Sequence, residues 1–343
     1  MPSTYQAAFF THNKNFELAQ QSTPQPAKNE VVVDIAYCGI CGTDLHIFHG
    51  AMPHRLGDRR VLGHEVSGTV AAIGADVSKV AVGDNVVIRP LAHCDNCPAC
   101  DAGHNHICHN LRFLGIDTDG GFAEKWTVPD YTLHKLPANV SLRDAALVEP
   151  LAVACHDVAR GQLKAGEDAL VIGGGPIGLL VAMAAKAAGA NVTVSEVNET
   201  RLQIIKSLGF NTINPSNENL KESINQATGN KGADVVFEVS GSQSGVDACT
   251  ETAAVRGRIV MVAIHPEAPK IDLFQFFWRE LELFGARVYQ SENYDQAIEM
   301  LANGDVATDT MITHVAPLTD IQSAFEALDG DATAMKSLIA INA

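Results

Sequence analysis

The feature that most restricts the fold of this 343-residue chain is a glycine-rich segment at residues 173–178, which reads Gly-Gly-Gly-Pro-Ile-Gly. An apolar run at 168–172 predicts a strand before it, and residues 176–188 predict a helix after it. Pro176 falls in the first turn of that helix, where a missing N–H is tolerated. Glycines in this context let the backbone approach a pyrophosphate at the positive end of a helix. The segment therefore predicts a dinucleotide-binding site in a βαβ unit.

A second expected strand, residues 191–195, ends at Glu196. A carboxylate at this place accepts hydrogen bonds from both ribose hydroxyls of NAD and repels the 2′-phosphate of NADP. Arg201 lies nearby and by itself favours NADP, but it leaves the charge of Glu196 in place. We therefore predict NAD as the cofactor.

The remaining pattern predicts an α/β chain with two domains. Strands expected at 30–37, 66–73 and 85–88 are rich in β-branched residues, so the first 150 residues are expected to be mostly β. Beyond the glycine segment, strands and helices alternate, which predicts a parallel, doubly wound sheet. The expected elements are strands at 233–239, 257–263 and 281–288, a helix at 244–254, helices at 293–303 and 320–328, and a final strand at 336–342.

Metal-ligating residues recur in the first half of the chain. Cys41 opens the run Cys-Gly-Thr-Asp-Leu-His, and His64 and Glu65 follow as neighbours. A catalytic zinc ion takes three protein ligands and keeps one open position, and a cysteine, a histidine and a carboxylate form an allowed set. Cys41, His64 and either Glu65 or Glu149 would complete it. The alternative is that Cys38 and Cys41 are a redox pair or two buried small side chains.

Four further cysteines, Cys94, Cys97, Cys100 and Cys108, share one short loop. Four thiolates at this spacing are typical of a closed, structural zinc site, and an iron–sulfur cluster is the rival interpretation. Free surface thiols would be an oxidation liability. The histidines around the loop are expected to be solvated; they are His93, His104, His106 and His109.

Composition restricts the partners and the compartment. The 40 acidic and 24 basic residues give a net charge of −16, which argues against nucleic acid and anionic membrane surfaces as partners. The longest apolar run, residues 177–185, is too short to span a bilayer, and the N-terminus lacks a signal-peptide pattern. The chain has eight cysteines, five of which have the spacing of metal ligands, and this suits a reducing compartment, so a cytoplasmic protein is expected.

Taken together, these motifs resemble the zinc-dependent medium-chain dehydrogenase/reductase (alcohol dehydrogenase) family, in particular its polyol branch of sorbitol, threonine and butanediol dehydrogenases. The resemblance covers essentially the whole chain. It implies a GroES-like catalytic domain, residues 1–153 and 290–343, with a structural zinc lobe at about 93–109. It also implies a Rossmann domain at 154–289, one catalytic and one structural Zn²⁺, and a homotetramer or homodimer.

The same resemblance implies roles for individual residues. Cys41, His64 and Glu65 would bind the catalytic zinc with Glu149 close to the metal, and Asp44 would anchor a ligand imidazole. Thr43 and His46 would relay the alcohol proton to solvent. NAD contacts are expected from Gly173, Gly175, Pro176, Ile177, Gly178, Glu196, Arg201, Val262, Ala263, Ile264, Val288 and Tyr289. Ala263 replaces a glycine that relatives often have, so a close approach of the backbone to the nicotinamide is not assured there.

The implied activity is oxidation of a secondary alcohol of a polyol, sugar acid or small diol to the ketone, by hydride transfer from a zinc-bound alkoxide to NAD. L-Threonine is the alternative substrate. A non-catalytic metal or dinucleotide binder and a zinc-free reductase of quinones or enoyl groups are the rival classes. The substrate pocket has no motif; its candidate lining residues are Phe48, His49, Arg55, Phe113 and Trp278.

Overall fold

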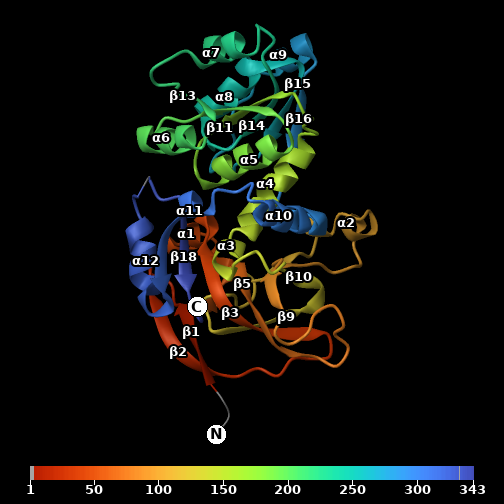
Figure 1. The fold of residues 1–343 in the computed structure, drawn as a ribbon, viewed down its shortest axis with the longest axis vertical. Coiled ribbons are helices and arrows are strands. Elements are labelled where there is room, and N and C mark those ends of the chain that lie inside the picture. Colours follow the sequence, from red (N-terminus) through yellow and green to blue (C-terminus); the bar gives the residue numbers. More distant parts are fainter. Residues whose placement is uncertain (1–3, 332) are drawn as a thin grey trace. The chain divides into compact units, whose positions relative to one another are not determined.

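The computed structural model describes residues 4–331 and 333–343 and divides into two compact units (Figure 1). The first comprises residues 1–149, 290–304 and 308–343, and the second comprises residues 150–289 and 305–307. The sequence predicted the first boundary between the domains at residue 153. This is four residues after the observed boundary at residue 149 and lies inside helix α4 (Val148–Arg160).

The second unit is built on a six-stranded parallel sheet with the strand order β13-β12-β11-β14-β15-β16. Right-handed crossovers run in opposite directions from β11, so helices cover both faces, as expected for a doubly wound sheet. Its strands are β11 (Asp168–Ile172), β12 (Asn191–Ser195), β13 (Asn211–Ile213), β14 (Ala233–Glu238), β15 (Ala253–Met261) and β16 (Glu282–Gly285). Its helices are α5 (Pro176–Ala187), α6 (Glu199–Ser207), α7 (Leu220–Ala227), α8 (Gln243–Thr252) and α9 (Leu273–Arg279).

One expected strand of this unit is shorter than the apolar pattern suggested. The run at 281–288 forms only β16, which ends at Gly285. Val288 has a φ of 47°, which is incompatible with an extended strand. The chain therefore leaves the edge of the sheet before the apolar pattern ends.

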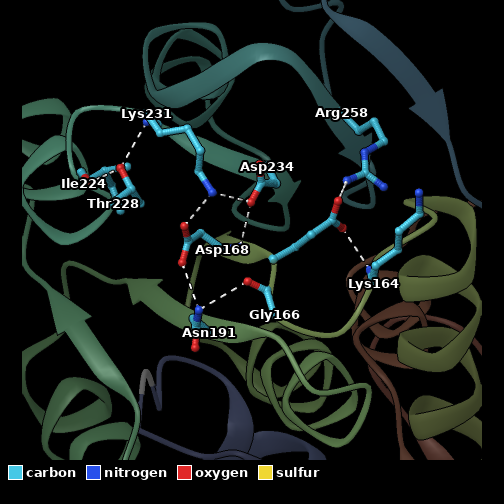
Figure 2. Close-up of polar contacts among 11 residues, drawn as sticks. Lys164, Gly166, Asp168, Asn191, Ile224, Thr228, Lys231, Asp234 and Arg258 are labelled. Carbon is cyan, nitrogen blue, oxygen red and sulfur yellow. Dashed lines mark hydrogen bonds and ion pairs between the residues drawn. The ribbon is translucent and has the colours of Figure 1, made fainter.

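A charged network closes the amino ends of these strands (Figure 2). The Lys231 ammonium lies 2.8 Å from the carboxylate of Asp168 and 2.7 Å from that of Asp234. Asp234 also accepts a hydrogen bond from the backbone N–H of Asp168, and the Asn191 amide donates to Asp168 at 3.1 Å. One cation thus holds two carboxylates on neighbouring strands together, at the edge opposite to the glycine segment.

The first unit is mainly β. A seven-stranded sheet runs β10-β6-β5-β3-β18-β17 with β9 also paired to β3, beside a three-stranded sheet, β2-β1-β4, and the pair β7-β8. These strands are β1 (Thr4–Phe10), β2 (Phe16–Ser22), β3 (Glu30–Ile40), β4 (Arg60–Val61), β5 (Glu65–Ile73), β6 (Asn85–Ile88), β7 (Leu91–Ala92), β8 (Arg112–Phe113), β9 (Lys125–Pro129), β10 (Leu133–Lys135), β17 (Ile312–Pro317) and β18 (Lys336–Ala340).

Short helices connect these strands, and longer ones follow residue 290. They are α1 (Gly42–Phe48), η1 (Pro53–Arg55), α2 (Pro98–Asp101), η2 (Asn105–Ile107), η3 (Asp130–Thr132), α3 (Leu142–Ala145), α10 (Ser291–Asn303), α11 (Thr308–Met311), η4 (Leu318–Asp320) and α12 (Ile321–Leu328). Strand β18, from the last segment of the chain, pairs antiparallel with β3. The final segment therefore completes the sheet that began with the first residues.

Aromatic side chains fill the core of the first unit. The Phe48 ring lies 5.3 Å from the Phe325 ring and 6.1 Å from the Phe16 ring, and its side chain is buried. The interpretation of Phe48 as a pocket-lining residue is therefore wrong, because its apolar surface is used to pack α1 against α12.

No helix in the described part of the chain is both long and apolar enough to cross a membrane.

Asp157 on α4 is a buried carboxyl whose Oδ2 has no hydrogen-bond partner among the described residues. Burial raises its pKa well above the ordinary value. In the unfolded chain this carboxyl group has a pKa of about 3.9. The free energy of unfolding should therefore decrease as the pH rises above that value. We expect Asp157→Asn to be more stable than the wild type at pH 8 in urea unfolding, with the advantage shrinking toward pH 4. Asp58→Asn, at an exposed carboxylate, is the matched control; an equal gain in both variants would contradict the assignment.

Candidate active site

Strand pairing brings Cys41 and His64 together. In the β3–β5 ladder Gly39 lies opposite Glu65, so the residues that follow Gly39 face those that precede Glu65. Cys41 comes directly after β3 and caps α1, where its backbone N–H donates to the Asp44 carboxylate at 2.9 Å. A rigid sheet edge and a helix start therefore fix the two expected ligands.

One ligand atom from each of Cys41, His64 and Glu65 lies within 4.8 Å of the others, which is compatible with a shared metal ion. His64 is 2% exposed, and its Nδ1 lies 3.6 Å from Oδ1 of the fully buried Asp44. Neither of these two atoms has a hydrogen-bond partner within the described residues. Asp44 thus faces one ring nitrogen and leaves the other for a metal, as an orienting carboxylate does.

The electrostatics of this cluster also suit a cation. Burial lowers the pKa of His64, but the nearby Asp44 carboxylate and Cys41 thiol raise it, and the net direction is upward. In other words, the surroundings of the imidazole favour positive charge. A bound Zn²⁺ would supply that charge, so the donor set fits the metal.

Glu65 has a second partner, which the sequence did not reveal. Both of its carboxylate oxygens accept from the ammonium of Lys336 on β18, at 2.7 and 2.8 Å, and both side chains are buried. Gly39 makes room for this carboxylate, since a Cβ there would overlap Glu65 Oε2. Glu65 can therefore act as a zinc ligand or as the partner of Lys336.

Glu149, the other candidate carboxylate, is the second residue of α4 and is 6% exposed. Burial lowers the pKa of Lys336, while Glu65, Cys41 and Glu149 raise it, and the net direction is upward. Glu149 therefore lies close enough to the cluster to act on Lys336 electrostatically.

Thr43 and His46 lie three residues apart on α1, which places them on the same face of the helix. Thr43 is partly buried and His46 is exposed. The pair thus joins a partly buried position next to Cys41 with an exposed one on the same helix.

The four cysteines of the lobe converge. Their sulfur atoms all lie within 4.8 Å of one another, with separations of 3.5 Å between Cys97 and Cys100 and 3.4 Å between Cys94 and Cys108. The backbone N–H groups of Cys100 and His109 lower the pKa of Cys97 to about 6. Backbone donors that stabilise a thiolate are what a Zn²⁺ site with four sulfur ligands needs.

Cys100→Ser is expected to reduce bound zinc from two ions per chain to one and to lower the melting temperature by more than about 5 °C, because the lobe loses its cross-link. Metal analysis and thermal unfolding measure both effects. The control is His104→Ala, an exposed histidine of the same lobe, which should retain both ions. Full zinc content in Cys100→Ser would contradict the four-sulfur assignment.

Near these sites the structure bears on the alternative for Cys38 and corrects the expectation for one histidine. The Cys38 side chain is fully buried, and a Cβ on Gly63 would meet its sulfur; burial raises the pKa of this thiol, so it serves packing rather than redox chemistry. His106 is 7% exposed, and so it is not the solvated side chain that was expected. His104 and His109 are exposed.

The glycine segment turns tightly at the carboxyl end of β11. Gly173 has a φ of 102°, and a Cβ on Gly178 would overlap the Gly173 carbonyl oxygen. Gly175 caps α5, and Pro176 and Ile177 begin the helix. The backbone N–H groups at the start of α5 are therefore open to a phosphate.

The Glu196 side chain is fixed by backbone hydrogen bonds that the sequence did not indicate. Its carboxylate accepts the backbone N–H groups of Gly174 at 2.7 Å, Val197 at 2.7 Å and Asn198 at 2.8 Å. The Arg201 guanidinium lies 4.0 Å away. Glu196 thus connects the glycine loop to the end of β12 and presents a fixed negative charge there.

The other expected NAD residues lie at or after the carboxyl ends of strands. Val262, Ala263 and Ile264 follow β15 directly, and Ile264 is 83% exposed. Val288 and Tyr289 follow β16, but Tyr289 is fully buried, so it has no surface for a cofactor contact in this conformation.

Sequence reasoning missed Glu238 at the end of β14. Its buried carboxylate accepts from the backbone N–H groups of Ser240 and Gly241 and lies 3.3 Å from His265 Nε2. It orders the loops after β14 and β15 at the same sheet edge as the glycine segment. An acidic residue that ends an apolar strand, as Glu196 does, was the available signal.

Comparisons with known proteins agree with this geometry. The family description "Alcohol dehydrogenase GroES-like domain" matches residues 27–138, and "Zinc-binding dehydrogenase" matches residues 176–303. The 2-dehydro-3-deoxy-L-galactonate 5-dehydrogenase of Pseudoalteromonas atlantica is 53% identical over 98% of this chain and 99% of its own length. The chain belongs to the zinc-type medium-chain alcohol dehydrogenases.

More distant members of this alcohol dehydrogenase family are also similar over most of the chain. The L-threonine 3-dehydrogenase of Pyrococcus furiosus is 34% identical over 87% of this chain and 87% of its own length. The solved structure of a zinc-binding dehydrogenase of Sinorhizobium meliloti bound to NADP has a TM-score of 0.92 at 32% identity, covering 98% of this chain and 99% of that one.

These findings confirm the predicted family, the fold class of a GroES-like domain with a Rossmann-type sheet, and an enzyme with zinc and nicotinamide cofactors. The rival of a zinc-free reductase does not fit an alcohol dehydrogenase that has both cysteine-containing metal clusters. A non-catalytic role does not fit its dehydrogenase relatives.

Proposed function

We propose that this alcohol dehydrogenase oxidises the C5 hydroxyl of a 2-dehydro-3-deoxy sugar acid to a ketone, with 2-dehydro-3-deoxy-L-galactonate as the substrate and NAD as the acceptor. The observation that carries the proposal is the 53% identity with the Pseudoalteromonas atlantica 5-dehydrogenase along nearly the whole of both chains. L-Threonine oxidation has less support, since that relative is 34% identical.

In this proposal Cys41, His64 and either Glu65 or Glu149 hold the catalytic metal, and Asp44 keeps the His64 ring in one orientation. Zinc at this place supplies a Lewis acid that lowers the pKa of an alcohol. The Thr43 hydroxyl accepts a hydrogen bond from the substrate hydroxyl and passes its proton to His46 and solvent. A bound nicotinamide would accept the hydride of the reacting carbon, which is the chemistry that this cofactor supplies.

The proposal of NAD rather than NADP is supported by Glu196. Three backbone N–H groups donate hydrogen bonds to its carboxylate and fix its position, which suits the two hydroxyls of an unmodified ribose. A 2′-phosphate would meet this charge at a site that is 7% exposed and weakly screened. Arg201 contributes a cation at 4.0 Å, which reduces the repulsion without removing it.

The test is a panel of substrates with NAD⁺ and with NADP⁺, followed by the absorbance of the reduced cofactor. The panel holds 2-dehydro-3-deoxy-L-galactonate, L-galactonate, a neutral polyol, 2,3-butanediol and L-threonine. We expect the highest kcat/KM for the 2-dehydro-3-deoxy acid with NAD⁺. Preference for threonine or for a neutral polyol would overturn the substrate, and preference for NADP⁺ would overturn the cofactor.

We also propose a homo-oligomer, dimer or tetramer, whose copies meet at the edge of the parallel sheet. Edge strand β16 and helix α9 expose apolar side chains there: Leu273 69%, Phe274 60%, Phe277 76%, Trp278 70% and Leu283 48%. A patch of this kind is typical of a subunit interface, and two unpaired strand edges can pair across a two-fold axis. Light scattering of Phe277→Glu against the wild type tests it, since an unchanged mass would contradict the interface.

A cytoplasmic location completes the proposal. The eight cysteines are all unbridged in the described part of the chain, and two metal clusters account for five of them. Thiolate ligands of this kind persist in a reducing compartment. Cell fractionation with an antibody against the chain is the direct test.

A further inference from the structure

An arginine and an aspartate form a two-pronged ion pair beside the catalytic cluster. The Arg55 side chain donates from Nε to Asp117 Oδ1 at 2.7 Å and from Nη2 to Asp117 Oδ2 at 2.8 Å. Arg55 ends the short helix η1, and its side chain is 28% exposed. The position and plane of the guanidinium are thus fixed while part of it faces solvent.

This pair is connected to the metal cluster through Phe113. The Asp117 carboxylate also accepts the backbone N–H of Phe113 at 2.7 Å. The Phe113 ring in turn lies edge-on to the His64 ring, with the centroids 5.1 Å apart and the planes at 88°. Asp117 and Phe113 therefore link Arg55 to a proposed zinc ligand.

The guanidinium has an unused edge. Of its five N–H groups, Asp117 engages two and the Met52 sulfur, at 3.5 Å from Nη1, engages one. Within the described part of the chain the other two, one each on Nη1 and Nη2, have no acceptor. Two parallel N–H groups on one edge match the two oxygens of a carboxylate.

The local charge also favours an anion. Burial raises the pKa of Asp117, but the hydrogen bond from Arg55 and the nearby Arg112 lower it, and the net direction is downward. Asp117 therefore stays ionised between two arginines, which leaves one net positive charge. In a chain of net charge −16 such a positive spot beside the active site is a specific feature.

We propose that Arg55 binds the C1 carboxylate of the substrate and so selects 2-oxo sugar acids over neutral polyols. This inference rests on the proposed function. Three carbons separate the C1 carboxylate of the substrate from the reacting C5, so we place C5 at the metal cluster and the carboxylate at Arg55, beyond Phe113.

Lys336 contacts the cluster directly through Glu65, and it does not suit this role. Lys336 is 4% exposed, and Glu65 already occupies its ammonium. Arg60 begins β4, five residues after Arg55, and has a comparable acidic partner, Asp119 at 3.5 Å. Arg60 therefore provides a matched control.

The experiment compares 2-dehydro-3-deoxy-L-galactonate with its neutral methyl ester, which has the same carbon skeleton and reacting hydroxyl. For Arg55→Gln we expect kcat/KM to fall by about 10- to 100-fold for the acid, from the loss of hydrogen bonds to a charged group, and to change little for the ester. Arg55→Lys keeps the charge but loses the paired N–H groups, so its kcat/KM for the acid should lie between those of the wild type and Arg55→Gln. Arg60→Gln should keep the wild-type ratio of acid to ester.

A second measurement uses pyruvate, which presents only the carboxylate and the oxo group. It should inhibit the wild type competitively against the acid and should inhibit Arg55→Gln at least about 10-fold more weakly. If Arg55 only braces the loop of Phe113, the acid and the ester will lose activity equally and pyruvate inhibition will be unchanged, which overturns the proposal. A wild type that prefers neutral polyols over both probes would instead refute the proposed function. Zinc content and thermal unfolding of each variant show that it is folded.

Discussion

Replacing Lys336 by methionine is expected to lower the free energy of unfolding by about 3–5 kcal/mol, because a buried carboxylate loses its counter-ion. Glu65 is 1% exposed and Lys336 is 4% exposed, and both carboxylate oxygens accept from the ammonium. Neither water nor another cation can replace the lost contact without rearrangement of the β3–β18 pair. Urea unfolding of the chelator-treated protein measures the effect apart from the stabilisation by bound zinc.

Two further variants determine whether the charge or the packing is responsible. Lys336→Arg keeps a cation and should lose less stability than Lys336→Met. Lys336→Met combined with Glu65→Gln removes both charges, so the double variant should recover much of the loss, which a double-mutant cycle quantifies. A double variant as unstable as the sum of the single ones would show that the ion pair is not the cause.

Replacing Thr43 by valine is expected to lower kcat by about 10²- to 10⁴-fold, the usual contribution of a positioned proton-transfer group. Valine has nearly the same shape as threonine but no hydroxyl, so the proton of the substrate has no path along α1 to the exposed His46. Steady-state kinetics with the sugar acid and NAD⁺ measure the effect, and metal analysis should show that the zinc content is unchanged.

Thr43→Ser is the matched control, because it restores a hydroxyl at the same position and should regain most of the activity. In Thr43→Val the dependence of kcat on pH should also steepen, since hydroxide must replace the relay. Similar activities of the valine and serine variants would mean that Thr43 acts through packing rather than through its hydroxyl.

The sequence was most informative where the chemistry of a residue leaves few alternatives. The strand at 168–172 and the strand at 191–195 have the expected bounds, because buried parallel strands are uninterrupted apolar runs between glycine turns. Four cysteines on one loop and the Cys41, His64 and Glu65 set converge in space, as their spacing indicated. At these strands and ligand sets, the residues that form the sequence pattern are also the ones that form the structure.

Contacts between distant segments were not predictable in the same way. Nothing near Lys336 in the sequence marks it as the partner of Glu65, because the pairing depends on the register of β18 against β3. Likewise, Phe48 follows the ligand-rich run and suggested a pocket, whereas packing against Phe325 places it in the core. The apolar pattern at 281–288 also extended beyond β16, which ends at Gly285, and Val288 adopts a left-handed conformation that no strand contains.

The Glu65–Lys336 pair also has a consequence for how the chain is made. The two residues are 271 positions apart, and the whole nucleotide-binding sheet is encoded between them. During synthesis on the ribosome the Glu65 carboxylate therefore emerges long before its cation, and the intervening domain can fold first. The metal-binding half of the nascent enzyme can mature only after its last strand has left the exit tunnel.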